Sequence, residues 1–309
     1  MDKFVVSYSP FVRSSNDINK MFIWTAVTLL LPTVFGCVFF GINSLFVVVA
    51  SVIGCYLSES FFNLISGKKF RVFDLSFLVT GMILGCSLSV KTPIYVVIIC
   101  GFISCFVVKM VFGGLGKNKL NPALVGRLFA GMFTAKMTES LYTITMNGDV
   151  YTSLSQGGEN TIRNLLMGNS IGGIGTTCVI LILVAYAFLI YMDVIDWKIP
   201  LFSMISYLVA SIALCGMEKA LMYFCSGSFV FVCVFMMTDP NTSPNTFIGK
   251  LLYSILFGAL SAFVWKLGFI GEDSVFVVAL FVNILVPFMD KYLVVKQKPL
   301  GGYRYAYKN

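Results

Sequence analysis

Long apolar segments, separated by short polar stretches, recur along almost the whole chain. A transmembrane helix needs about 20 predominantly apolar residues to cross the hydrocarbon core of a bilayer. The 309-residue sequence is 58% hydrophobic and only 12% charged, whereas about 25% of the residues of a soluble domain are charged. These features predict an all-α polytopic membrane protein with about ten transmembrane helices. The expected segments are 21–41, 44–65, 73–89, 93–112, 121–135, 171–192, 200–215, 218–237, 248–268 and 274–289.

The basic residues are distributed unevenly between the two sides of this arrangement. Cytoplasmic loops of membrane proteins carry an excess of Lys and Arg. With the N-terminus in the cytoplasm, 16 of the 22 basic residues fall on the cytoplasmic side, and Arg127 falls within the fifth segment. The other five, on the outer side, are Lys91, Lys136, Arg163, Lys219 and Lys266. This bias predicts two cytoplasmic termini, and it explains the net charge of +8 without a nucleic-acid-binding surface.

Ten segments divide into two sets of five. Because five is odd, the second half enters the membrane from the opposite side, and related halves would form an inverted repeat with sites at broken helices. The expected organisation is a single membrane domain, 1–309, with a first five-helix half (1–135), an outer loop (136–170) and a second five-helix half (171–309). Each half contains one polar interruption, at 113–122 and at 238–245.

The first interruption is the strongest candidate for a site. The 13 residues from Gly114 to Gly126 are Gly-rich and cationic, and they lie between two apolar stretches. Broken helix at membrane depth is tolerated where protein or a polar cavity surrounds it. Asn121 is expected to cap a helix whose first residue is Pro122. A tight connection between helices would explain this geometry alone.

A functional interpretation adds a ligand to the same geometry. A helix start presents free N–H groups and a positive dipole end, which favour a phosphate or an electron-rich ring. The candidate cofactor-binding residues are Gly113, Gly114, Asn118, Asn121 and Arg127. Inserting an arginine such as Arg127 into the centre of a membrane span costs about 2.5–3.5 kcal/mol of free energy on insertion scales. Its side chain should therefore face a cavity, a carboxylate or a cofactor, or else extend to the membrane surface.

Metal binding and histidine chemistry are not expected from this chain. It contains no His, and none of its nine Cys residues forms a CxxC pair. Two acidic residues, Glu59 and Asp74, lie near the predicted inner ends of apolar segments. The simpler interpretation of both is solvation at a helix end. The alternative is a path for a cation, which would need partner subunits.

Short motifs in a fixed order carry a resemblance to a known family. They are Ser9-Pro10-Phe11-Val12-Arg13-Ser14, Phe73-Asp74-Leu75-Ser76, Phe112 to Asn118, Asn121-Pro122-Ala123-Leu124 with Arg127, Gly172-Gly173-Ile174-Gly175, Thr238-Asp239-Pro240, and Asn283-Ile284-Leu285-Val286-Pro287. This order resembles the RnfD subunits of the Rnf complex and the related NqrB subunits of the sodium-pumping NADH:quinone reductase. The resemblance covers nearly the whole chain. The length of 309 residues favours an RnfD subunit over an NqrB subunit, because NqrB subunits are longer at the N-terminus.

The resemblance implies a subunit of a bacterial inner-membrane complex that passes electrons between ferredoxin and NAD⁺ and drives Na⁺ or H⁺ transport. The other Rnf subunits would be its partners. In this family FMN is esterified through its phosphate to a threonine on the outer side. Thr152 takes that place here, with Ser153-Leu154 after it and Val150-Tyr151 in place of the family's small pair.

Asn121 and Arg127 are expected to line a polar cavity that holds a second, non-covalent flavin such as riboflavin, or else the edge of the first flavin. Two other functions remain open from the sequence. Inverted five-helix repeats also occur in urea-transporter-like channels, and the chain would also suit a flavin-free scaffold subunit of the same complex.

Overall fold

The computed structural model describes residues 18–66, 75–112, 114, 118–134, 165–168, 172–225, 227–267 and 274–293. Within these ranges the chain is almost entirely helical and has no strand. The helices are α1 (Ile18–Phe40), α2 (Asn43–Ser66), α3 (Ser76–Ser87), α4 (Ile94–Cys105), η1 (Phe106–Met110), α5 (Pro122–Thr134), α9 (Val179–Tyr191), α10 (Lys198–Cys215), α11 (Met217–Phe224), α12 (Ser228–Phe231), η2 (Val232–Met236), α13 (Phe247–Lys266) and α14 (Ser274–Leu293). The prediction of an all-α polytopic membrane protein is confirmed.

Five of the described helices are long and apolar enough to cross a membrane, namely α1, α2, α10, α13 and α14. The pair formed by α11 and the α12–η2 helix bends by 55° and adds a sixth span if it crosses as one broken element. Four shorter apolar helices cover 76–87, 94–110, 122–133 and 179–191. Each predicted segment thus contains at least one helical element, while the number of crossings stays a prediction.

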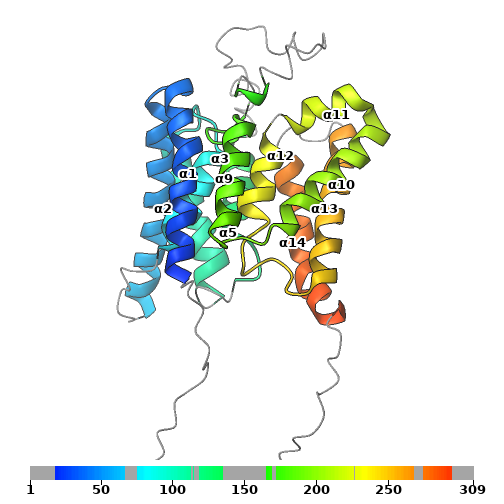
Figure 1. Cartoon of the computed structure of the whole chain (residues 1–309). Coiled ribbons are helices and arrows are strands. Elements are labelled where there is room, and N and C mark those ends of the chain that lie inside the picture. The colour runs from blue at the N-terminus through cyan, green and yellow to red at the C-terminus, as the bar shows by residue number, and fades with distance from the viewer. Residues whose placement is uncertain are drawn as a thin grey trace, which may run out of the picture.

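Successive long elements run in opposite directions, and the start of α1 lies at the same end of the molecule as the end of α14 (Figure 1). By the direction of their helices, Lys20, Lys109, Lys198, Lys250 and Lys291 also belong to this end. Lys91, Lys219 and Lys266 belong to the opposite end. The basic residues described in the structure therefore segregate as the sequence predicts. Which compartment each end faces stays a prediction.

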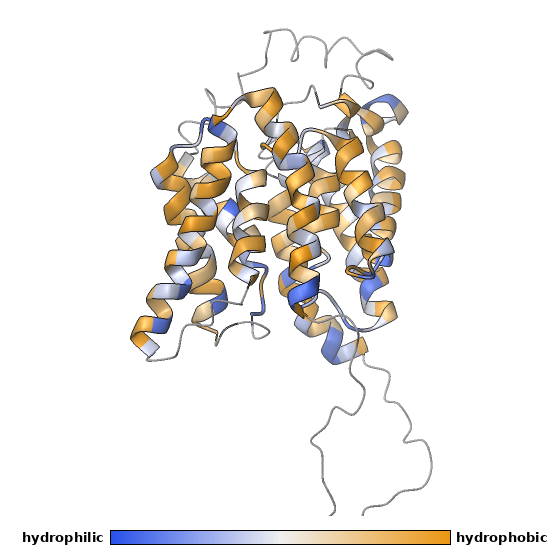
Figure 2. Cartoon of the chain, turned by 60° about the vertical axis from the view of Figure 1, so that its left-hand side comes forward, coloured by the Kyte–Doolittle hydropathy of each residue, from blue (hydrophilic) through white to orange (hydrophobic). Residues whose placement is uncertain are grey.

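Apolar residues cover the helices, and hydrophilic residues gather mainly toward the two ends (Figure 2). Large apolar side chains also point outward along the long helices, with 75% of Val38 and 65% of Ile65 exposed. Because so much exposed apolar surface would be unfavourable in water, the outer surface is suited to lipid or to partner subunits.

One closely packed helix pair occurs in both halves. In the first half α2 packs closely against both α4 and α3, and in the second half α10 packs mainly against α13. Glycine permits the close approach of the helices in both pairs. A Cβ atom at Gly101 of α4 would lie only 2.7 Å from the carbonyl oxygen of Ser51 on α2. A Cβ atom at Gly258 of α13 would lie only 2.5 Å from the carbonyl oxygen of Ser203 on α10. Small residues are typical of such contacts between membrane helices. This agreement is in line with the predicted repeat, which the structure does not otherwise test.

The predicted segment 171–192 starts too early, because the helix begins only at Val179. The described residues before it run as irregular backbone along the end of α3. The N–H groups of Ile174 and Gly175 donate to the carbonyl oxygens of Leu88 (2.9 Å) and Cys86 (2.7 Å). These bonds satisfy the backbone of an apolar stretch without a helix, which is why the apolar pattern alone was misleading.

Candidate functional site

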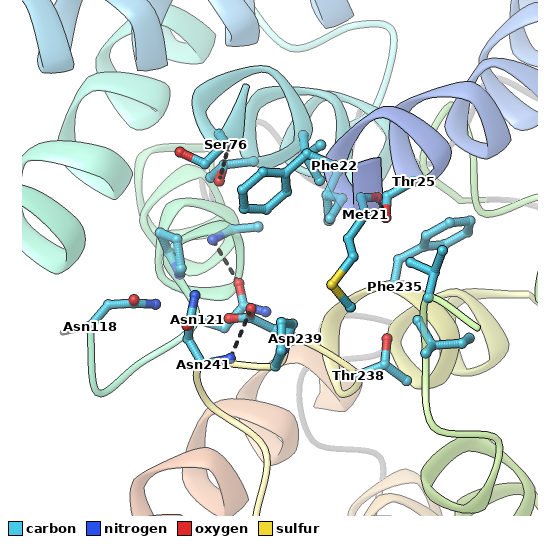
Figure 3. Close-up of a pocket in the computed structure, with 18 of the residues that line it drawn as sticks. Met21, Phe22, Thr25, Ser76, Asn118, Asn121, Phe235, Thr238, Asp239 and Asn241 are labelled. Carbon is cyan, nitrogen blue, oxygen red and sulfur yellow. Dashed lines mark hydrogen bonds between the residues drawn. The ribbon is translucent and has the colours of Figure 1, made fainter. Parts of the chain in front are cut away.

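The two polar interruptions meet at one pocket near the end of the molecule that holds the start of α1 (Figure 3). The pocket encloses about 780 Å³ of empty space, including its open mouth. Its apolar wall comes mainly from α1, α3, the end of α9 and η2, and includes Phe22 and Phe235. Its polar residues are Thr25, Ser76, Thr80, Lys109, Asn118, Asn121, Thr238, Asp239 and Asn241. Both halves of the chain therefore build this pocket.

A π-helix leads into each interruption. In η1 the N–H of Val111 donates to the carbonyl oxygen of Phe106 at 3.0 Å, and in η2 the N–H of Met237 donates to that of Val232 at 2.9 Å. Each bond spans five residues instead of the four of an α-helix. Such π-helical turns are rare and often occur at functional sites. Apolar periodicity did not reveal them, because one extra residue barely changes the pattern.

Asn121 fixes the start of α5 at the pocket. Its Oδ1 accepts a hydrogen bond from the N–H of Ala123 at 3.0 Å, which is the geometry of an N-cap. The predicted cap and the predicted first helical residue, Pro122, are confirmed. The Asn121 Nδ2 donates to the carbonyl oxygen of Met236 at 2.8 Å. The end of η2 is thus tied to the start of α5.

Asn283 on α14 joins the two interruptions. Its Oδ1 accepts from the backbone N–H of Asn121 at 3.0 Å, and its Nδ2 donates to the carbonyl oxygen of Thr242 at 3.0 Å. The side chain of Asn283 is completely buried. The sequence motif contained this residue, but only the fold reveals what it binds.

Replacing Asn283 with Leu should destabilise the folded protein by about 2–6 kcal/mol. The change leaves the Asn121 N–H and the Thr242 carbonyl buried without this partner, and each lost partner costs about 1–3 kcal/mol. Thermal unfolding in lipid nanodiscs measures the effect. Asn63→Leu, the same change at a half-buried position of α2, is the control. Equal stability of the two variants would contradict the proposed bridge.

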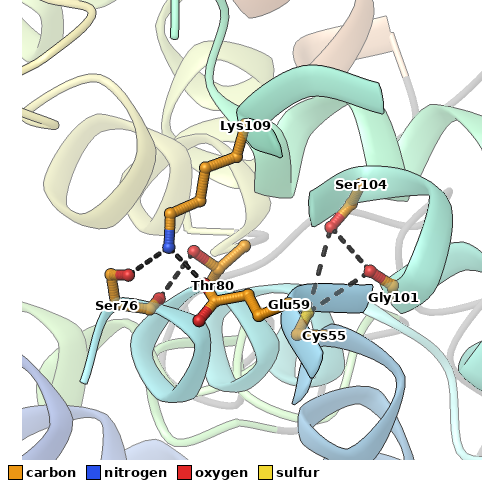
Figure 4. Close-up of polar contacts among 7 residues, drawn as sticks. All are labelled: Cys55, Glu59, Ser76, Thr80, Gly101, Ser104 and Lys109. Carbon is orange, nitrogen blue, oxygen red and sulfur yellow. Dashed lines mark hydrogen bonds and ion pairs between the residues drawn. The ribbon is translucent and has the colours of Figure 1, made fainter. Parts of the chain in front are cut away.

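Lys109, in the last turn of η1, forms a buried ion pair at the pocket (Figure 4). Its Nζ donates to Oε1 of Glu59 on α2 and to Oγ of Ser76 on α3. Lys109 is 3% exposed and Glu59 is 5% exposed. The interpretation of Glu59 as a solvated helix end is therefore wrong. Asp74, the other acidic residue expected at a helix end, lies outside the described residues.

Asp239 lies in the second interruption and also lines the pocket. Its carboxylate accepts from Oγ1 of Thr242 at 3.1 Å and from the N–H of Asn241 at 3.4 Å. Burial raises the pKa of Asp239, although these hydrogen bonds and the charge of Lys109 oppose the rise. The pocket lining thus contains one ammonium group and one carboxyl group.

Asn118 leaves an acceptor available in the pocket. Its Nδ2 donates to the carbonyl oxygen of Leu120 at 3.3 Å, whereas its Oδ1 has no hydrogen-bond partner among the described residues. The residue is only 6% exposed. Because a buried acceptor without a partner is costly, Asn118 is suited to accept a hydrogen bond from a bound ligand or an ordered water.

Arg127 does not line this pocket, contrary to the expectation that it shares a cavity with Asn121. It lies six residues further along α5, about 9 Å at 1.5 Å per residue. Its Nε donates to the carbonyl oxygen of Ser87 at 3.0 Å, and its guanidinium lies 4.9 Å from the centre of the Phe276 ring. Ser87 ends α3, so the cation meets the negative end of a helix dipole.

The remaining predicted site residues are only partly placed. Gly114 has a φ of +99° and its N–H donates to the carbonyl oxygen of Lys109 at 3.0 Å. Glycine adopts such a φ without strain, so Gly114 turns the chain directly after η1. Gly113 and Thr152 lie outside the described residues. Among the residues that are described, no group of three or more Cys, Asp or Glu side chains could hold a metal ion.

Sequence similarity to known proteins extends over nearly the whole chain. The sequence model of the NQR2, RnfD, RnfE family matches residues 5–299. The chain belongs to this family. The match includes all helices of the structure, both interruptions and every residue of the pocket.

Three relatives illustrate the extent of the similarity. The D subunit of the proton-translocating ferredoxin:NAD(+) oxidoreductase complex of Clostridium ljungdahlii is 28% identical, over 94% of each chain. The D subunit of the Na(+)-translocating complex of Acetobacterium woodii is 27% identical, over 93% of this chain and 92% of its own. The D subunit of the ion-translocating oxidoreductase complex of Methanosarcina acetivorans is 28% identical, over 98% and 99%.

Proposed function

We propose that this family member is the D-type membrane subunit of an ion-translocating ferredoxin:NAD⁺ oxidoreductase complex of the Rnf type. The observation that carries the proposal is similarity, over more than nine-tenths of both chains, to D subunits of ion-translocating oxidoreductase complexes, two of which are named for ferredoxin:NAD(+). The chain would act only as part of the oxidoreductase, with the other membrane and peripheral Rnf subunits as its partners. It would lie in the bacterial inner membrane with both termini in the cytoplasm.

The proposal leaves the transported ion open between Na⁺ and H⁺. One relative is named for protons and another for Na⁺, at 28% and 27% identity respectively. Overall similarity to these two proteins therefore does not distinguish the ions.

In this proposal the subunit carries flavin in two ways. FMN is bound covalently to Thr152 through a phosphoester, on the outer side, and relays electrons there. Riboflavin or a similar flavin is bound without a covalent bond in the pocket. The pocket supports the second assignment because it combines an apolar wall with amide and hydroxyl groups. A flavin has the matching features: a flat apolar ring and a polar edge with an N–H donor and carbonyl acceptors, which Asn118 Oδ1 and the asparagine amides could bind.

The mass of the intact subunit tests covalent attachment. When the chain is produced together with its flavin transferase, the peptide containing Thr152 should carry the mass of one FMN. Thr152→Val should lose the covalent FMN completely because the ester requires a hydroxyl, whereas Thr152→Ser should keep part of it. Ferredoxin:NAD⁺ activity of the complex should fall in parallel. A wild-type peptide of unmodified mass would contradict the covalent assignment.

Labelling with a membrane-impermeant maleimide tests the orientation. Thr152→Cys should react from outside intact cells, as should Asn43→Cys, which is exposed at the start of α2, at the end of the molecule opposite the start of α1. Asn241→Cys, exposed at the other end, should react only in inverted vesicles. Labelling of residue 152 from the cytoplasmic side alone would contradict both the topology and the place of the flavin.

A further inference from the structure

The pocket contains a cation that the stability of the fold does not explain. Replacing a buried ion pair with apolar residues is often neutral or stabilising, so the pair formed by Lys109 and Glu59 is weak grounds for a purely structural role. Ionisable side chains within membrane segments are costly, and they usually mark function. Lys109 lies in the apolar segment 93–112 and is buried at 3% exposure.

The geometry separates the two members of the pair. Lys109 lines the pocket, whereas Glu59 is not among the lining residues. Glu59 and Ser76 bind the ammonium group from α2 and α3 and so fix its position (Figure 4). Asp239 lies in the same lining (Figure 3), and the Lys109 charge acts on it. A ligand in the pocket would therefore be closer to the cation than to the carboxylate that neutralises it.

We propose that Lys109 sets the reduction potential of the electron carrier bound in the pocket, with Glu59 as the positioning residue that holds Lys109 and reduces its field. The inference rests on the proposed non-covalent flavin. Each electron that a flavin receives from a one-electron carrier adds one negative charge, unless a proton follows. A fixed ammonium group stabilises that charge strongly in a site of low dielectric constant. A nearby charge is one of the means by which proteins tune a flavin.

Single and double variants distinguish this role from a structural one. Glu59→Gln leaves the ammonium group less neutralised, so it should shift the equilibrium of one-electron reduction at least tenfold toward reduced flavin, about 59 mV. Lys109→Met in the Glu59→Gln background removes the cation and should more than reverse this shift. This double variant has no unpaired charge at the pair and is expected to fold. Compared with wild type, it should favour oxidised flavin at least threefold, because the charge nearer the ligand is lost.

The measurement is a redox titration of bound riboflavin by absorbance, on the full chain in nanodiscs. All variants carry Thr152→Val, so that no covalent FMN contributes to the signal. The control variant, Asp196→Asn with Lys250→Met, removes an ion pair that does not line the pocket and whose Nζ and Oδ2 atoms lie 2.6 Å apart. It should leave the reduction potential of the bound riboflavin unchanged. Packing damage alone could not move the potential in opposite directions in the single and double variants.

The outcomes separate this inference from the function on which it rests. Riboflavin that binds with the same potential in wild type and in the double variant overturns the role of Lys109 and leaves the flavin pocket intact. A shift of the double variant toward reduced flavin also overturns it. A wild-type chain that binds no riboflavin contradicts the flavin pocket itself, and the role of Lys109 with it.

Discussion

Replacing Gly227 with Ala should prevent the chain from folding stably, a larger effect than that of most single substitutions. Gly227 has a φ of +87° and precedes α12. A Cβ at this position would lie 1.8 Å from the carbonyl oxygen of Thr176, in the irregular stretch before α9. The left-handed backbone conformation would cost alanine about 1–2 kcal/mol. The clash with Thr176 would add to this cost, because the backbone at Gly227 and the backbone at Thr176 cannot move apart without disturbing α3.

A second glycine with the same backbone conformation isolates the effect of the clash. Gly41, between α1 and α2, has a φ of +84° and nothing within 4 Å of where a Cβ would lie. Gly41→Ala should therefore cost only the conformational term, and the variant should accumulate in the membrane as a folded protein. The yield of monodisperse protein after extraction measures both variants. Equal yields of Gly227→Ala and Gly41→Ala would contradict the close packing at Thr176.

Replacing Lys109 alone with Met should destabilise the protein by about 3–5 kcal/mol. Removing one member of a buried ion pair leaves the other charge uncompensated, and this is the usual size of the penalty. Glu59 would remain buried without its cation, and Ser76 would lose the donor that binds its Oγ. Thermal unfolding at constant lipid composition measures the change.

The double variant Lys109→Met with Glu59→Gln should recover most of the lost stability, because the uncompensated charge is gone. Lys250→Met, which breaks the more exposed pair with Asp196, should cost no more than about 1 kcal/mol. A Lys109→Met variant as stable as Lys250→Met would show that Glu59 is solvated after all, as its place near a helix end suggests.

The sequence predicted the helical elements well because apolar length is a local property. Each of the ten expected segments contains a helical element, and Asn121 with Pro122 marks the start of α5 where capping preferences place it. The prediction failed at 172–178, where most residues are buried without forming a helix. The hydropathy of this stretch indicates that it is buried but not which backbone conformation it adopts. That conformation depends on the hydrogen bonds of Ile174 and Gly175 to the end of α3, which lies more than 80 residues earlier in the sequence.

The site was only partly predictable, for a similar reason. Asn118 and Asn121 stood out because they break an apolar pattern, and both line the pocket. Glu59 was assigned to a helix end and Lys109 was counted only among the basic residues of the cytoplasmic side. A Lys inside one apolar segment and a Glu inside another were nevertheless signals that the two pair. Asn283 could not be linked to Asn121 without the fold, since 162 residues separate them.

The asparagine bridge also constrains the order of events during synthesis. Residues of α1, α3 and η1 are made early, and α2 can already pack against α4 within the first half. The opposite wall of the pocket, from Val234 to Asn241, and the Asn283 side chain that joins the two interruptions are made much later. A nascent chain that ends before α14 therefore contains every lining residue of the pocket but lacks the side chain that holds its two polar interruptions together. We expect the pocket to reach its final geometry, and to bind a ligand tightly, only after the last helix has been inserted.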